Sequence, residues 1–308
     1  MTFRQAAEGF YKAKAHEWKN AKHSAQFLST LETYAYPFIG HLPVADIEID
    51  DMLGVLEPIW TTKTETASRV RGRMEVVFGY AIATRHRTAG NPARWKGQLE
   101  RVLASPMKLR KAKSHAALPY KVLPAFIEDL RKREAMAARA LEFLILCASR
   151  TSEVTGATWN EIDLVAKAWT IPADRMKAGK EHRVPLSKPA LALLDQLGPG
   201  AATDPVFPAR DRRPMSNMAM ATLLKRMDRT DITVHGFRSA FRDWAGDETT
   251  FPRELAEAAL AHTLGKTERA YRRSDALERR RALMQDWADW CAGEQPAGEN
   301  VTPIRKAV

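Results

Sequence analysis

The chain has 308 residues, which is enough for a sizeable core and for more than one domain. Apolar residues make up 45% and charged residues 28%, as is typical of a soluble globular protein. The formal charge of +11 favours a polyanionic partner, either nucleic acid or an anionic membrane surface, although much basic charge on proteins is simply solvated.

The cysteines and the apolar runs restrict the protein class further. Cys147 and Cys291 do not form a CxxC pair, so neither a disulfide framework nor a zinc module is expected, and no other metal-ligand pattern is present. The first 18 residues lack an apolar signal region, and the longest apolar run, residues 143–148, is too short to cross a bilayer. We therefore expect a reduced, intracellular compartment and no membrane role.

Helical spacing of apolar residues predicts about four helices in a first domain, residues 1–104. Two of them fall within 3–35, and a turn region rich in proline and glycine follows at 34–47. A third helix resumes near Asp46 or Asp50, and the fourth is a long amphipathic helix over 64–86.

A basic segment, residues 105–118, separates this domain from the next. No acidic residue occurs between Glu100 and Glu128, and the segment is only weakly periodic. We interpret it as an interdomain linker that runs along a phosphate backbone, the alternative being a solvated tether. Its basic side chains are Lys108, Arg110, Lys111 and Lys113.

The second domain is predicted over residues 119–291. It opens with helices near 120–134 and 136–149, of which the second is apolar nearly all round and therefore buried. A β-hairpin with a lysine-rich loop follows, and after a polar loop the chain is helical over 216–290. The tail, 292–308, has the composition of a disordered or adaptable segment.

The segment "TVHGFRSAFRDWAGDE", residues 233–248, predicts an amphipathic helix. At ~100° per residue, His235, Arg238 and Arg242 fall on the side opposite the apolar stripe, so we expect them to point outward. Thr233 is a suitable N-cap, and a helix N-terminus attracts phosphate. An ordinary exposed basic face is the alternative.

Four other positions could carry chemistry, although none is decisive alone. Arg150 follows the buried helix and either pairs structurally with Glu153 or offers its guanidinium to a phosphate. Lysines in the hairpin loop could reach a groove or merely favour solubility. A histidine and a tyrosine follow further along the chain, although an isolated histidine is more often structural and a tyrosine is mostly protonated at neutral pH. These positions are Lys177, Lys180, His262 and Tyr271.

The order of these residues is more specific than any one of them. An arginine, a hairpin lysine, an HxxR box, a histidine and a tyrosine follow one another in "SRTSEV", "RMKAGKEHRVPLS", "HGFR", "LAH" and "AYRRSD". The sequence thereby resembles the tyrosine recombinase (phage integrase) family over nearly the whole chain, most strongly over 145–272. The glycine usual before the first arginine is replaced here by Ala148 and Ser149.

The resemblance implies a mainly α fold, with a helical core-type DNA-binding domain followed by a mixed α+β catalytic domain that holds a small β-hairpin or sheet. The first domain is similar to integrases of prophages and genomic islands, which usually carry a further N-terminal arm-binding domain with no counterpart in this sequence. The implied activity is site-specific DNA recombination, which integrates or excises a mobile element without metal or nucleotide cofactor.

The resemblance also implies residue roles. Tyr271 would attack the scissile phosphate and form a 3′-phosphotyrosyl link, while Arg150 and Arg238 hold the non-bridging oxygens. His262 would add a hydrogen bond to the same phosphate, and Glu153 would support the site. Lys177 would protonate the leaving 5′ oxygen, and His235 would exchange the proton of the nucleophile.

The partners implied are double-stranded DNA, three further copies of the chain in a tetramer, a DNA-bending host factor and an excisionase, in the bacterial cytoplasm at the nucleoid. Two other readings remain open: a non-cleaving DNA-binding accessory or regulatory protein, and a relaxing topoisomerase. The expected DNA contacts are Arg69, Arg71, Arg73, Lys108, Arg110, Lys111, Lys113, Lys180 and Arg242.

Overall fold

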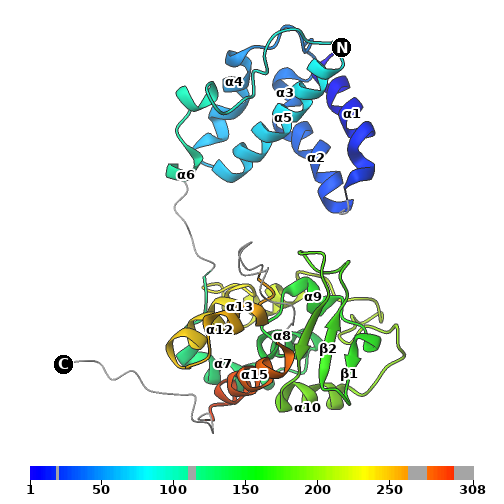
Figure 1. Ribbon diagram of the computed structural model, residues 1–308, viewed down its shortest axis with the longest axis vertical. Coiled ribbons are helices and arrows are strands. Elements are labelled where there is room, and N and C mark those ends of the chain that lie inside the picture. Colours follow the sequence, from blue (N-terminus) through cyan, green and yellow to red (C-terminus); the bar gives the residue numbers. More distant parts are fainter. Residues whose placement is uncertain (19–20, 110–115, 263–275, 295–308) are drawn as a thin grey trace, which may run out of the picture. The chain divides into compact units, whose positions relative to one another are not determined.

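The computed structural model describes residues 1–308 except 19–20, 110–115, 263–275 and 295–308. The chain divides into two compact units, Met1–Lys113 and Ser114–Val308 (Figure 1). The division falls within the segment predicted as the linker. Each unit has its own hydrophobic core, as expected for independent domains.

The first unit is all helical. Helices α1, α2 and α4 pack on the long helix α5, whose apolar stripe, including Val70, Met74 and Phe78, is fully buried. The predicted turn region contains one short helix, α3, because a proline is tolerated in a first turn. The elements are α1 (Phe3–Lys14), α2 (Ala21–Tyr34), α3 (Tyr36–Ile39), α4 (Ile49–Trp60), α5 (Thr64–Ala83) and α6 (Pro106–Leu109), with 3₁₀ turns at Ala15–Glu17 and Leu99–Arg101.

The second unit combines packed helices with a small antiparallel sheet, on which α15 packs, so the mainly α prediction is confirmed. The strands lie in the order β1-β2-β3, and Trp169 of β2 pairs with Val184 of β3 as the predicted hairpin requires. The edge strand β1 was not predicted, because two residues are too few for alternation to show. The bounds are β1 (Ile162–Asp163), β2 (Ala168–Ile171) and β3 (His182–Pro185).

The helices of this unit surround α8, which is buried all round as its sequence predicts. The region 216–290 contains α11, α12, α13 and α15, and Trp244 of α12 packs on Trp287 of α15 with ring centroids 5.0 Å apart. The helices are α7 (Leu123–Arg131), α8 (Met136–Leu146), α9 (Thr151–Thr155), α10 (Lys188–Leu197), α11 (Ala219–Arg226), α12 (Gly236–Asp247), α13 (Arg253–Ala259) and α15 (Leu277–Ala292), with 3₁₀ turns at Tyr120–Val122 and Trp159–Glu161.

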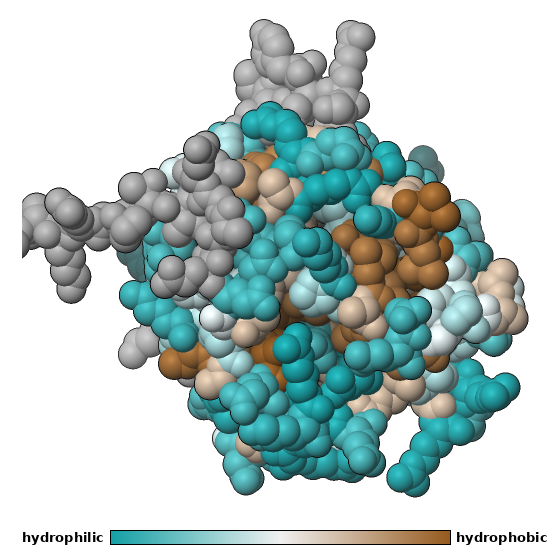
Figure 2. Space-filling model, turned by 90° about the horizontal axis from the view of Figure 1, so that it is seen from below, coloured by the Kyte–Doolittle hydropathy of each residue, from teal (hydrophilic) through white to brown (hydrophobic). Residues whose placement is uncertain are grey.

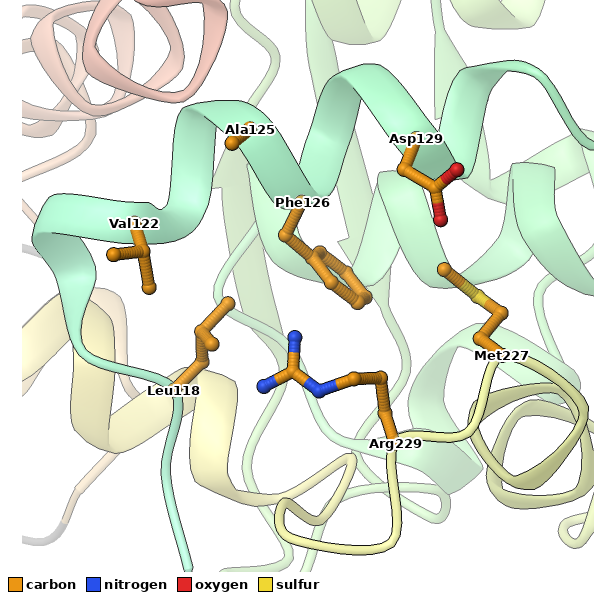
Figure 3. A pocket seen from close by; sticks show the side chains of 7 residues that line it. All are labelled: Leu118, Val122, Ala125, Phe126, Asp129, Met227 and Arg229. Carbon is orange, nitrogen blue, oxygen red and sulfur yellow. The ribbon is translucent and has the colours of Figure 1, made fainter.

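The face in Figure 2 is mainly hydrophilic, with its apolar residues in separate patches. The pocket in Figure 3, of about 300 Å³, holds the Arg229 guanidinium 5.8 Å from the Phe126 ring centroid, and Asp231 pairs with that arginine. None of the predicted catalytic residues lines this pocket. Among the described helices, none combines the length and apolarity that crossing a membrane requires.

The end of the predicted linker crosses the start of α12. The Ala116 carbonyl accepts the Thr233 N–H at 2.9 Å and lies 3.3 Å from the Thr233 hydroxyl, which also accepts the Gly236 N–H at 3.0 Å. A Cβ on Gly236 would lie 2.3 Å from the Ala116 oxygen. The backbone can therefore pass this close to α12 only because position 236 is glycine.

Replacing Gly236 by alanine is expected to lower the free energy of unfolding by about 1–3 kcal/mol, because backbone must shift to admit the methyl group. The matched control is Gly246→Ala in the same helix, where the new Cβ would meet only the Arg242 side chain at 3.9 Å. This control should gain about 0.5–1 kcal/mol, as glycine is costly inside a helix. Urea unfolding of both variants tests the difference, and equal effects would contradict it.

Candidate active site

The site is built on the C-terminal ends of two helices, α8 and α13. Each helix is followed by an alanine in the left-handed region, Ala148 with φ 48° and Ala261 with φ 48°. The last carbonyls of a helix lack partners within it and carry partial negative charge, so they attract cations. Glycine would be the usual residue at such a turn.

Arg150 is fixed by a buried carboxylate. Glu153 is 2% exposed, and its two oxygens lie 2.7 Å from Arg150 Nη1 and 2.7 Å from the Arg150 backbone nitrogen. The Arg150 side chain remains 21% exposed. The ion pair expected from the sequence is therefore present, and it leaves the guanidinium partly accessible.

The outward orientation predicted for Arg238 is wrong, because this residue is only 4% exposed. Its Nη1 donates to the Ala148 carbonyl and its Nη2 donates to the Leu260 carbonyl at 2.6 Å. The ends of α8 and α13 close over this side of α12, which helical periodicity alone does not reveal. Burial, assisted by the charge of Arg150, lowers the pKa of Arg238 to about 10, so the group is still a cation at neutral pH.

The two guanidinium groups converge on one atom. The Leu260 oxygen accepts from Arg238 Nη2 at 2.6 Å and from Arg150 Nη2 at 3.3 Å. Glu153 is the carboxylate in contact with this pair, so the three groups sum to one positive charge. Such a centre is suited to a singly charged anion such as a phosphodiester, for which arginine offers paired donors.

His262 lies beside the arginine pair. Its Nε2 is 3.3 Å from Arg238 Nη2, and its Nδ1 is 2.6 Å from an oxygen of Glu257. The side chain is 46% exposed, so it is accessible to a substrate. The second Glu257 oxygen is 2.5 Å from Arg242 Nε, which places Arg242 in an ion pair within the protein. The sequence analysis missed Glu257; its place five residues before the histidine, near the end of α13, was the available signal.

The hairpin loop is anchored at its base and exposed beyond it. Arg175, which the sequence analysis also missed, donates to the backbone carbonyl of Glu153 and pairs with Glu161. Lys177 and Lys180 follow in the exposed part of the loop. The loop that carries the predicted lysine acid is thus attached to the helix turn that holds Arg150.

The two remaining predicted catalytic residues to report are His235 and Tyr271. His235 is exposed and forms the N-cap of α12, so the N-cap predicted at Thr233 is wrong. The Thr233 hydroxyl still accepts the N–H of Gly236, the first residue of the helix, at 3.0 Å. Tyr271 lies outside the described residues. Within the described ranges, no group of three or more acidic, histidine or cysteine residues could hold a metal ion.

The predicted DNA contacts differ in exposure. Arg69 is exposed and lies 3.0 Å from Glu65, whereas Arg71 is mostly buried and bonded to Glu75 and to a backbone carbonyl. Arg73 donates to the Gln26 carbonyl at 2.6 Å, and Lys108 is exposed. Arg110, Lys111 and Lys113 lie outside the described residues.

Comparison with known proteins identifies related sequences over both units. Residues 3–98 match the phage integrase central domain, and residues 117–278 match the phage integrase family. The chain is 31% identical to Prophage integrase IntZ of Escherichia coli K12, over 93% of this chain and 70% of that protein. It is 28% identical to the integrase of Enterobacteria phage P4, over 91% and 69% respectively.

Solved structures show the same fold at low sequence identity. A lambda integrase fragment crystallised as a dimer on a core DNA site superposes with a TM-score of 0.65 at 18% identity, over 89% of this chain and 96% of that one. A lambda integrase tetramer bound to a Holliday junction gives a TM-score of 0.66 at 17% identity, over 86% and 79%.

His182 on β3 makes the stability of the second unit depend on pH under acidic conditions. Burial, with the charge of Arg280, lowers the pKa of His182 to about 4, whereas an unfolded histidine titrates near 6.5. Between these values the unfolded chain binds a proton that the folded chain does not, so stability is lost as the pH falls through this window. The full difference corresponds to about 3 kcal/mol.

Replacing His182 by glutamine, which is neutral at every pH, should remove this contribution. We expect the free energy of unfolding of the unsubstituted chain to fall by up to about 3 kcal/mol more than that of His182→Gln between pH 7 and pH 4. Urea unfolding across this range measures both curves. Parallel curves would show that His182 is not the group responsible.

Proposed function

Because the chain belongs to the phage integrase family, the tyrosine recombinases, and is a site-specific recombinase, we propose that it cleaves and rejoins duplex DNA through Tyr271. The DNA strand would be held as a 3′-phosphotyrosyl intermediate. The observation that carries this proposal is the convergence of Arg150 and Arg238 on the Leu260 carbonyl, with His262 beside them.

The first step would be an in-line displacement at phosphorus. The Tyr271 oxygen forms a bond to phosphorus while the bond to the 5′ oxygen breaks. Arg150 and Arg238 bind the non-bridging oxygens and stabilise the charge of the transition state. Both arginines are fixed before the substrate arrives, so little reorganisation is needed at the moment of reaction.

The protons must move in balance with these bonds. His235, exposed at the start of α12, would take the phenolic proton, and Lys177 of the exposed hairpin loop would give one to the leaving 5′ oxygen. His262 would donate a hydrogen bond to the same phosphate. Attack by the 5′ hydroxyl of a partner strand reverses the step, so no outside energy source is required.

The assembly proposed is a tetramer on two DNA duplexes. It is supported by related structures that are described as a dimer on a core site and a tetramer on a Holliday junction. A DNA-bending host factor and an excisionase are further proposed partners, and the bacterial nucleoid is the proposed location. We retain the nine predicted DNA-contact residues as proposals, among which Arg69, Lys108 and Lys180 have exposed side chains.

Replacing Tyr271 by phenylalanine should abolish covalent protein–DNA adducts on a nicked duplex from the ends of the element, because phenylalanine lacks the attacking oxygen. DNA affinity should change less than about twofold, an energy below about 0.4 kcal/mol. Denaturing electrophoresis measures the adduct and gel shift measures the affinity.

The matched control is Tyr120→Phe in the same unit, whose hydroxyl is bonded to Asp247 and Glu248 and which should still form adducts. Adducts that survive Tyr271→Phe would show that the nucleophile is another residue. If the unsubstituted chain binds the duplex without any adduct, the chain is a non-cleaving binder. Strand exchange between two duplexes separates a recombinase from a topoisomerase.

A further inference from the structure

We infer that Glu257 is a positioning residue that fixes the ring of His262, so that Nε2 is the atom presented to the substrate. The inference rests on the proposed role of His262 at the phosphate. It is carried by two separate bonds between the residues: the carboxylate oxygen lies 2.6 Å from Nδ1, and the His262 N–H donates to the Glu257 backbone carbonyl at 3.0 Å.

The carboxylate selects the tautomer of the ring. An ionised carboxylate only accepts hydrogen bonds, so the proton of a neutral His262 is held on Nδ1. The Nε2 lone pair then accepts from Arg238 Nη2 at 3.3 Å when no substrate is present. A neutral ring with its proton on Nδ1 has only a lone pair at Nε2, so the proposed hydrogen bond to the phosphate requires the protonated ring, in which Nε2 is a donor at the same position.

Glu257 itself is held in place by Arg242. Arg242 lies one turn after Arg238 on α12, and its Nε is 2.5 Å from the carboxylate oxygen that does not face His262. The carboxylate is therefore shared between a helix that carries a catalytic arginine and the turn that carries the histidine. Arg253, at 3.8 Å and 75% exposed, adds a weaker contact.

Contacts with His262 and Arg242 keep the Glu257 carboxylate ionised. The side chain is 17% exposed, and burial alone would favour the protonated form. The hydrogen bonds from His262 and Arg242 outweigh burial, and the pKa of Glu257 is lowered. The acceptor is thus ionised at neutral pH.

The test measures adduct formation and the state of the ring separately. On the nicked duplex, Glu257→Ala should slow adduct formation about tenfold to a hundredfold, the range for losing a carboxylate that orients a functional histidine. Glu254→Gln, a change of an exposed glutamate one turn earlier on α13, should have no such effect. The decisive comparison is with His262→Ala: adding Glu257→Ala to it should slow the reaction no further.

Nitrogen-15 NMR of the histidine rings supplies the second readout. The signals that His262→Ala removes should show a proton on Nδ1, and in Glu257→Ala these signals should shift toward a mixture of tautomers. An equal rate loss with and without His262, or an unchanged tautomer, would overturn the inference. If the unsubstituted chain forms no adduct, the proposed function fails, while the NMR result still decides whether Glu257 controls the ring.

Discussion

The catalytic unit depends on one backbone oxygen, the carbonyl of Leu260, which accepts from the guanidinium groups of both Arg150 and Arg238. Two like charges repel unless anions or dipoles lie between them. Here the dipoles come from the ends of α8 and α13, and the buried Glu153 supplies the anion. Because the arginines are already held together, a phosphate bound as we propose would complete a centre that has one positive charge to spare.

Other segments of the second unit are hydrogen-bonded close to the two arginines. Arg175 bonds the hairpin loop to the Glu153 carbonyl, and Glu257 connects His262 to α12. Ala116, near the end of the predicted linker, is bonded to Thr233 just before the same helix. Three parts of the chain that are distant in sequence are thus bonded close to proposed catalytic groups. An enzyme that accelerates a reaction by positioning its catalytic groups needs those groups to be held rigidly in this way.

Much of the fold could be predicted from sequence, because helical periodicity marks α5 and α12, a continuous apolar run marks α8, and alternation marks the hairpin. The short elements α3 and β1 could not, since four and two residues hold too little pattern. Helical periodicity also predicted that Arg238 is exposed, because the pattern of one helix does not show which other elements pack against it. The order of motifs gave Arg150, Glu153 and His262, which lie together. Arg175 bonds to the distant Glu153 carbonyl, which no local pattern marks, whereas Glu257 could have been found from its place five residues before His262.

The most direct measurement replaces the scissile phosphodiester by a methylphosphonate, in which a methyl group takes the place of one charged oxygen. If the two arginines serve the charge of a single phosphate, the loss of rate caused by Arg238→Ala on ordinary DNA should be largely recovered on the neutral linkage. The rate of adduct formation is measured for Arg238→Ala and for the unsubstituted chain on each substrate, and the ratio of the two rates gives the loss on that substrate. An equal loss on both substrates would contradict the account, because Arg238 would then be acting on the structure and not on the charge.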